Sequence, residues 1–265
     1  MAEVSSESPE LFSIKGKTAL VTGGSRGIGM MIARGFLQAG ARCYISSRKK
    51  AACDQAAAKL SEVGECISIP ADVSTADGIQ HLVSEIATLE PSLNILVNNA
   101  GAAWGAPLEE YPESGYDKVM DTNVKSIFFL TRDLVSLLEK GASPGDPARI
   151  INIGSIDGLR VPSIENYAYG PSKAAVHHLT KVLAAKLGER NITVNAIAPG
   201  PFESHMTEWM LANYQAMIEQ SCPLKRIGSP EDMAGTAIFL ASRAGAYVNG
   251  AVIPVDGGLC LKAAF

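Results

Sequence analysis

The sequence lacks the features that mark secreted, metal-binding and membrane-spanning proteins. Its five cysteines are scattered and form no Cys-x-x-Cys pair, a pattern typical of reduced thiols in the cytoplasm. Its four histidines show no spacing with cysteines or acidic residues that is typical of metal ligands. No apolar run approaches the length of a membrane span, and the first residues are acidic and polar, unlike a signal peptide. We therefore expect a cytoplasmic protein that uses no metal ion and does not associate with a membrane.

Charged residues are also few. They make up 19% of the chain, the net charge is −4 and the isoelectric point is about 5.6, which does not favour a nucleic-acid surface. The hydrophobic content of 47% excludes a disordered chain. A length of 265 residues is enough for one large α/β domain with a full core.

Short apolar runs alternate with helical patterns along the chain. The expected strands are Thr18–Thr22, Arg42–Ser46, Cys66–Ala71, Ile95–Asn98, Arg149–Ile153, Thr193–Ala198 and Val252–Val255. The expected helices lie near Met30–Ala39, Lys50–Val63, Ala76–Leu89, Tyr116–Lys140, Asn166–Arg190 and Pro230–Ser242. Because most of these strands are continuously apolar, both faces of the sheet should be covered. We predict an α/β fold, a single-domain Rossmann-type doubly wound parallel sheet of about seven strands in residues 14–265, after a flexible leader in residues 1–13.

A glycine-rich turn stands between the first expected strand and the first expected helix. Its sequence is Thr22-Gly23-Gly24-Ser25-Arg26-Gly27-Ile28-Gly29. At such a junction, backbone N–H groups and a helix N-terminus bind the pyrophosphate of a dinucleotide. The spacing Gly-x-x-x-Gly-x-Gly departs from the usual Rossmann fingerprint. Its position in a βα repeat nevertheless favours a cofactor site over a simple tight turn.

Tyr169 and Lys173 are four residues apart in the segment Tyr-Gly-Pro-Ser-Lys. On a helix they would lie on one face, where the lysine cation can lower the pKa of the phenol towards neutral pH. A phenol tuned in this way can exchange a proton with a substrate oxygen. Ser155 lies 14 residues before Tyr169, just after the fifth expected strand.

These motifs together resemble the classical short-chain dehydrogenase/reductase family, from about Lys15 to Gly258. Further matches follow in the family's order: Asp72-Val73, Asn98-Asn99-Ala100-Gly101, Asn123 and Pro199-Gly200. The sequence is most similar to the family's 3-oxoacyl-[acyl-carrier-protein] reductases and rhamnolipid-type ketoacyl reductases. The resemblance implies a nicotinamide-dependent oxidoreductase that acts on an alcohol or a carbonyl group.

The resemblance also implies a role for each matched residue. Tyr169 would be the acid/base, Ser155 would orient the substrate oxygen, and Lys173 would lower the pKa of Tyr169 and bind the nicotinamide ribose. Asn123 would hold a water molecule that links Lys173 to solvent. The expected cofactor-binding residues are Gly23, Ser25, Arg26, Gly27, Ile28, Gly29, Ser47, Arg48, Asp72, Val73, Asn99, Ala100, Gly101, Tyr169, Lys173, Pro199, Gly200, Phe202 and Ser204.

The charge beside the second expected strand indicates which cofactor is used. NAD-specific enzymes usually place an acidic residue there, whereas an arginine accommodates the 2′-phosphate of NADP. Here the strand runs into Ser47 and Arg48 without an acidic residue, and Arg26 stands inside the glycine turn. Two guanidinium groups can bind a phosphate through charge-assisted hydrogen bonds. We therefore predict NADP(H).

Residues 202–226 resemble the family's substrate lid. Methionines such as Met206 and Met217 suit a hydrophobic or variable substrate, but they could equally be core contacts of an amphipathic helix. Tyr167 would line the pocket or begin the catalytic helix. For His177 and His178 we expect surface or interface roles.

We expect an NADPH-dependent carbonyl reductase, with a ketone or a 3-oxoacyl substrate. The alternatives are an alcohol or polyol dehydrogenase working oxidatively and a nucleotide-binding sensor without activity. The resemblance leaves open whether an acyl carrier protein or coenzyme A presents the substrate, and it implies a homotetramer. We expect no nucleic-acid partner.

Overall fold

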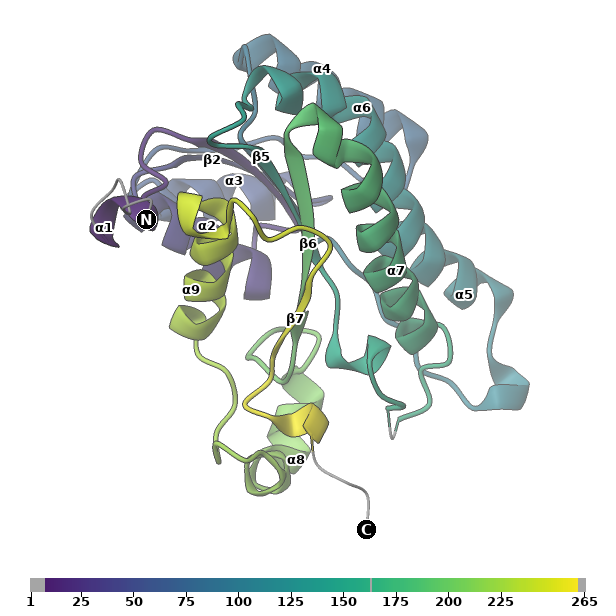
Figure 1. The fold of residues 1–265 in the computed structure, drawn as a ribbon. Coiled ribbons are helices and arrows are strands. Elements are labelled where there is room, and N and C mark those ends of the chain that lie inside the picture. Colours follow the sequence, from purple (N-terminus) through teal and green to yellow (C-terminus); the bar gives the residue numbers. More distant parts are fainter. Residues whose placement is uncertain (1–7, 163, 262–265) are drawn as a thin grey trace.

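The protein folds around one parallel sheet between two layers of helices (Figure 1). A computed structural model describes residues 8–162 and 164–261. Within these residues the sheet has seven strands in the order β3-β2-β1-β4-β5-β6-β7. The strands are β1 Thr18–Thr22, β2 Arg42–Ser46, β3 Cys66–Ser68, β4 Ile95–Asn98, β5 Ala148–Ile153, β6 Ile192–Pro199 and β7 Val252–Val255.

The helices cover both faces of this sheet. They are α1 Ser8–Leu11, α2 Gly27–Gln38, α3 Lys50–Leu60, α4 Ala76–Leu89, α5 Glu113–Met120, α6 Ser126–Lys140, α7 Tyr169–Leu187, α8 Glu208–Ser221 and α9 Pro230–Ala241. Helices α2, α3 and α9 contribute to one apolar core cluster, and α4, α6 and α7 to the other.

Neighbouring residues of one strand serve opposite clusters. In β1, Ala19 and Val21 belong to the first cluster and Leu20 to the second, and all three are fully buried. Because successive strand residues point to opposite faces, a continuously apolar strand needs cover on both sides. The prediction of a doubly wound parallel sheet is confirmed.

Strand β3 and the start of the chain are among the places where the structure differs from the expected elements. Strand β3 ends at Ser68 rather than Ala71, although the N–H groups of Ile69 and Ala71 still donate to the carbonyl oxygens of Ile45 and Ser47. Part of the leader that we expected to be flexible forms α1, which contacts the turn Arg243–Gly245. Among the described residues no helix is long and apolar enough to cross a membrane.

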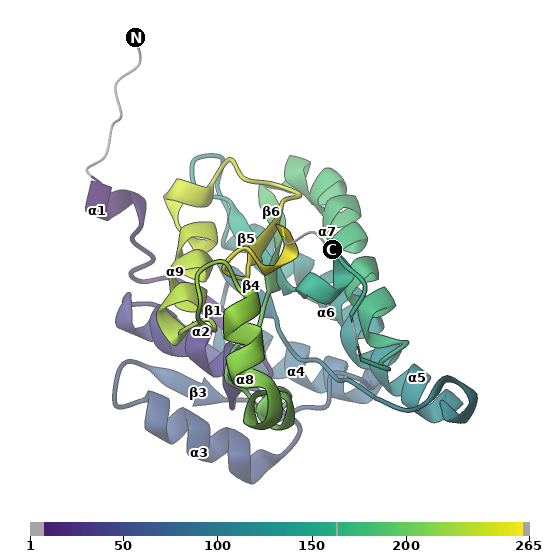
Figure 2. The same ribbon diagram turned by 90° about the horizontal axis from the view of Figure 1, so that it is seen from below.

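The strand order reverses between β1 and β4, which are neighbours although β2 and β3 separate them in sequence. At such a switch point, ligands bind in the crevice outside the carboxyl ends of the strands. Helix α8 lies beyond this end of the sheet, and Figure 2 views the molecule from that side.

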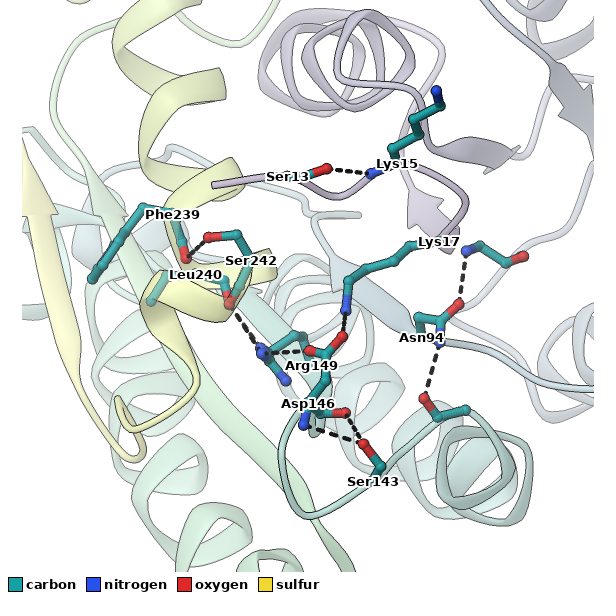
Figure 3. A network of polar contacts seen from close by, with 12 residues as sticks. Ser13, Lys15, Lys17, Asn94, Ser143, Asp146, Arg149, Phe239, Leu240 and Ser242 are labelled. Atoms are coloured by element: carbon teal, nitrogen blue, oxygen red, sulfur yellow. Dashed lines mark hydrogen bonds and ion pairs between the residues drawn. The ribbon is translucent and has the colours of Figure 1, made fainter. Parts of the chain in front are cut away.

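The opposite, amino-terminal end of the sheet carries a network of buried charge (Figure 3). Arg149 at the start of β5 is 1% exposed and donates to the carbonyl oxygens of Leu240 at 3.1 Å and Ser242 at 3.0 Å. It also pairs with Asp146, which accepts a second hydrogen bond from Lys17. The arginine thus joins β5 to the end of α9, far along the strand from the crevice.

Candidate active site

The glycine turn between β1 and α2 is too narrow for most side chains. Gly23 and Gly27 have φ angles of 65° and 53°, which favour glycine. A Cβ at Gly29 would lie 2.4 Å from the Gly23 carbonyl oxygen. Arg26, the N-cap of α2, makes no side-chain cap, so the first N–H groups of the helix keep the capacity to bind an anion.

Asn99 and Thr22 hold this turn in place. The Asn99 amide donates to the carbonyl oxygens of Thr22 at 2.9 Å and Gly23 at 3.2 Å. In return the Thr22 hydroxyl oxygen accepts from the N–H groups of Asn99 at 3.0 Å and Ala100 at 3.1 Å. Sequence reasoning did not assign Thr22 a role. Its hydroxyl at the end of a buried strand, directly before the glycines, was the available signal.

The end of β2 offers donors to a phosphate group. The Ser47 hydroxyl is buried and has no hydrogen-bond partner among the described residues. Next to it Arg48 is exposed, as is Arg26 in the glycine turn. A buried hydroxyl without a partner among the described residues, beside an exposed guanidinium, fits the 2′-phosphate that we predicted from the charge pattern.

Asp72 and Val73 lie just beyond β3. Val73 is buried, and one oxygen of the Asp72 carboxylate accepts from the N–H and the hydroxyl of Ser74, at 3.0 and 2.6 Å. This carboxylate therefore shapes the turn into α4.

Tyr169 and Lys173 share one face of the first turn of α7, as their spacing predicts. The Lys173 ammonium is buried, donates to the Ile153 carbonyl oxygen at 2.8 Å and lies 5.6 Å from the centre of the Tyr169 ring. Ser155 follows the end of β5, where its hydroxyl accepts from the Asp157 N–H at 3.1 Å. The carboxyl end of β5 therefore brings these three side chains together.

Burial controls the protonation of this group. It raises the pKa of Tyr169 to about 12, against the opposing effect of the Ser155 hydroxyl, and lowers the pKa of Lys173 to about 8. We expected Lys173 to lower the pKa of Tyr169. The structure differs because the ammonium is directed to the Ile153 carbonyl rather than to the phenol oxygen.

Asn123 lies in a π-helical turn, Asp121–Lys125, which interrupts the single helix that we expected over Tyr116–Lys140. Its side chain is fully buried and bonds both backbone groups of Ala102, at 2.8 and 3.0 Å. A Cβ at Gly101 would lie 3.4 Å from Asn123 Oδ1 and 3.8 Å from Lys173 Nζ. The structure thus places Asn123 near Lys173, and π-turns of this kind often occur at functional sites.

His177 contradicts the surface role that we expected for it. It lies four residues after Lys173 on α7 and is 6% exposed, and its ring packs so closely that a Cβ at Gly154 would lie 2.2 Å from Nε2. Burial and the nearby Lys173 charge lower its pKa to about 4, so the ring is neutral. The signal in the sequence was its helical spacing from Lys173.

The loop after β6 closes against the glycine turn. Gly200 lies so close to Asp256 that a Cβ there would be 2.8 Å from the Asp256 Cα, while the Phe202 ring is buried. A Cβ at Gly27 would lie 3.1 Å from the Ser204 Cβ. The Thr207 hydroxyl, which sequence reasoning missed, donates to the Phe202 carbonyl oxygen at 2.6 Å.

Helix α8 forms most of the expected lid segment. Met206 just before it and Trp209 and Met217 on it are 51%, 67% and 59% exposed, so these three side chains are not core contacts. The core alternative for these three residues is therefore wrong. Leu211 of the same helix is buried. Tyr167 lies outside α7, which begins at Tyr169, and its ring contacts Tyr111 with centroids 5.9 Å apart.

Comparison with known proteins identifies the family. A family model described as enoyl-(acyl carrier protein) reductase matches residues 23–260. The rhamnolipids biosynthesis 3-oxoacyl-[acyl-carrier-protein] reductase of Pseudomonas aeruginosa is 51% identical over 252 residues, covering 94% of this chain and 98% of that protein. The chain belongs to the short-chain dehydrogenase/reductase family.

Other members of the short-chain dehydrogenase/reductase family agree in fold and length. The Pseudomonas aeruginosa RhlG/NADP active-site complex has a TM-score of 0.91 and 50% identity, covering 95% of this chain and 99% of that chain. Gluconate 5-dehydrogenase of Gluconobacter oxydans is 36% identical, covering 96% of this chain and 98% of that protein. These matches confirm the resemblance that the motifs carried.

Proposed function

We propose that this protein is an NADPH-dependent carbonyl reductase that reduces a ketone, in particular a 3-oxoacyl thioester. The observation that carries the proposal is the meeting of Ser155, Tyr169 and Lys173 at the carboxyl end of β5, beside a glycine turn that fits a dinucleotide. The 51% identity to a 3-oxoacyl-[acyl-carrier-protein] reductase supports the same substrate class.

NADP(H) suits the residues at the crevice. The N-terminus of α2 would bind the pyrophosphate, and Ser47, Arg48 and Arg26 would bind the 2′-phosphate. Lys173 would hold the nicotinamide ribose, and the Phe202–Ser204 loop would cover the carboxamide. When bound, the cofactor supplies the hydride. The Pseudomonas aeruginosa RhlG structure, which is an active-site complex with NADP, supports this choice.

Tyr169 is the proton donor of the proposed reaction. Hydride transfer to a ketone develops negative charge on its oxygen, which needs a donor at that atom. Because its pKa is about 12, Tyr169 carries its proton at neutral pH. Ser155 donates a hydrogen bond to the same oxygen. Lys173 and Asn123 then return a proton to Tyr169 through a water-linked relay.

The protonation of Tyr169 favours reduction over oxidation. An oxidative polyol dehydrogenase needs this residue as a base, and a pKa of about 12 opposes that role at neutral pH. The 36% identity to gluconate 5-dehydrogenase keeps this alternative as the second candidate.

The exposed side chains of the lid segment suit an apolar acyl chain. Met206, Trp209, Met217 and Leu224 are all more than half exposed and follow the Phe202–Ser204 loop. An acyl carrier protein or coenzyme A would present such a chain as a thioester.

We place the enzyme in the cytoplasm as a homotetramer. Phe128 on α6 and Val182 on α7, both exposed, support a subunit contact there.

The test is a substrate panel with NADPH and NADH, followed at the nicotinamide absorbance. The panel holds simple ketones, 3-oxoacyl thioesters and an enoyl thioester, and gluconate is assayed separately with NADP+ and NAD+ because its reaction is an oxidation. We expect the fastest turnover with a 3-oxoacyl thioester and NADPH. The Tyr169→Phe variant should bind NADPH like the wild type but lose at least about a hundredfold in kcat. Retained turnover in this variant, or a preference for gluconate, would overturn the proposal.

A further inference from the structure

Ser172 lies between the two proposed catalytic residues of α7, and the mechanism above gives it no role. Its side chain is fully buried. Its hydroxyl donates to the Tyr169 carbonyl oxygen at 2.7 Å and accepts from Asn123 Nδ2 at 2.9 Å. One side chain thus joins the first turn of α7 to the π-helical turn.

Every proton of the Ser172 hydroxyl and of the Asn123 amide has an acceptor. The serine hydroxyl has one proton, which the Tyr169 carbonyl receives, so its lone pairs face Asn123. The two protons of Asn123 Nδ2 go to Ala102 and Ser172. The bonds to Ala102 fix the amide plane, whereas the bond to Ser172 fixes the amide relative to the catalytic helix.

This bond matters for proton transfer because of where Asn123 lies. A Cβ at Gly101 would lie 3.4 Å from Asn123 Oδ1 and 3.8 Å from Lys173 Nζ, so both atoms lie close to the same point. A shift of the π-turn relative to α7 would change this separation. We propose that Ser172 is a positioning residue, which holds Asn123 at the distance from Tyr169 and Lys173 that the proton relay requires. The proposal rests on the function proposed above.

The same helix supplies a matched control. Thr180 is also fully buried, donates to the Val176 carbonyl oxygen at 2.8 Å and accepts from the Asn152 amide at 2.9 Å. It therefore repeats the chemistry of Ser172, a helical hydroxyl between a backbone carbonyl and a buried asparagine, two turns farther along α7. Removal of either hydroxyl leaves one asparagine proton without a partner.

The experiment compares Ser172→Ala with Thr180→Val in the full-length protein. We expect both variants to lower Tm, because each leaves a buried donor unpaired. Only Ser172→Ala should lower kcat, by roughly tenfold, which is part of the 10²–10⁴-fold that acid–base catalysis contributes. The KM values for NADPH and ketone should stay within about twofold, and the pH profile of kcat should change shape. Ser172→Cys, with a weak acceptor in the same place, should fall between wild type and alanine.

A double-variant cycle tests whether Ser172 acts through Asn123. In an Asn123→Ala background, Ser172→Ala should change kcat by no more than about twofold, because the partner it positions is gone. If the double variant loses kcat by the product of the two single losses, Ser172 and Asn123 act independently and the positioning role is overturned. Equal losses of kcat in Ser172→Ala and Thr180→Val would also overturn it. A wild type that reduces no ketone would instead overturn the proposed function, and the role of Ser172 with it.

Discussion

Replacing Lys173 by methionine should stabilise the protein at neutral pH. Burial lowers the pKa of this lysine from its ordinary 10.5 to about 8 in the folded state. At about 1.4 kcal/mol per pKa unit, the buried ammonium destabilises the folded protein by about 3 kcal/mol at pH 7. Methionine keeps an apolar chain of similar length and removes the charge.

The effect should depend on pH in a defined direction. Below pH 8 the lysine is charged in both states, so the full penalty is present. Between pH 8 and 10.5 the unfolded chain binds a proton that the folded protein has lost, so wild-type stability rises with pH. The advantage of Lys173→Met should therefore fall from about 3 kcal/mol at pH 7 to about 1 kcal/mol at pH 9.5.

Urea denaturation of both proteins without nucleotide, at pH 7 and pH 9.5, measures this difference. The lost hydrogen bond to the Ile153 carbonyl shifts both values equally, so the change of about 2 kcal/mol is the decisive quantity. Lys181→Met serves as control, because this lysine lies on the same helix but is exposed. A difference between wild type and Lys173→Met that is the same at both pH values would refute the reasoning.

The cofactor, the amino-terminal end of the sheet and the assembly give further predictions. Arg48→Asp should raise KM for NADPH by roughly tenfold or more and favour NADH, since a charge-assisted hydrogen bond contributes about 1.5–3 kcal/mol; an unchanged preference in kinetics with both cofactors would contradict this. Arg149→Met should lower the free energy of unfolding in urea by about 2–4 kcal/mol with kcat unchanged, because two buried carbonyl oxygens lose their donor and Asp146 keeps only Lys17. Light scattering should give the mass of a tetramer, and a stable, active monomer would contradict the proposed assembly.

The sequence predicted the regular part of the fold well. Four strands, β1, β2, β4 and β7, have the bounds that their apolar runs indicate. In β1, β2 and β4 nearly every residue is buried, so both faces of the strand require apolar side chains. The glycine turn could also be predicted, since only glycine fits where a Cβ would clash with a neighbouring backbone atom.

The parts that the sequence did not predict depend on contacts between distant segments. The π-turn at Asn123 lies where the amide bonds Ala102 in the loop after β4, and no local pattern near residue 123 indicates that partner. The pKa of Tyr169 was misjudged for a similar reason. Spacing places Lys173 beside the ring, but only the fold shows that its ammonium is directed to Ile153.

A buried cation lies near each end of strand β5, and the two differ in their hydrogen-bond and ion-pair partners. Arg149 at the amino end has a carboxylate partner in Asp146 and two carbonyl acceptors. Lys173 at the carboxyl end has the Ile153 carbonyl, and the described residues place no carboxylate in a salt bridge with it. Buried charge without a counter-ion destabilises a fold, so its presence here is best explained by what Lys173 does with bound ligands. The stability gained by Lys173→Met and the activity lost with it would measure that conflict at one residue.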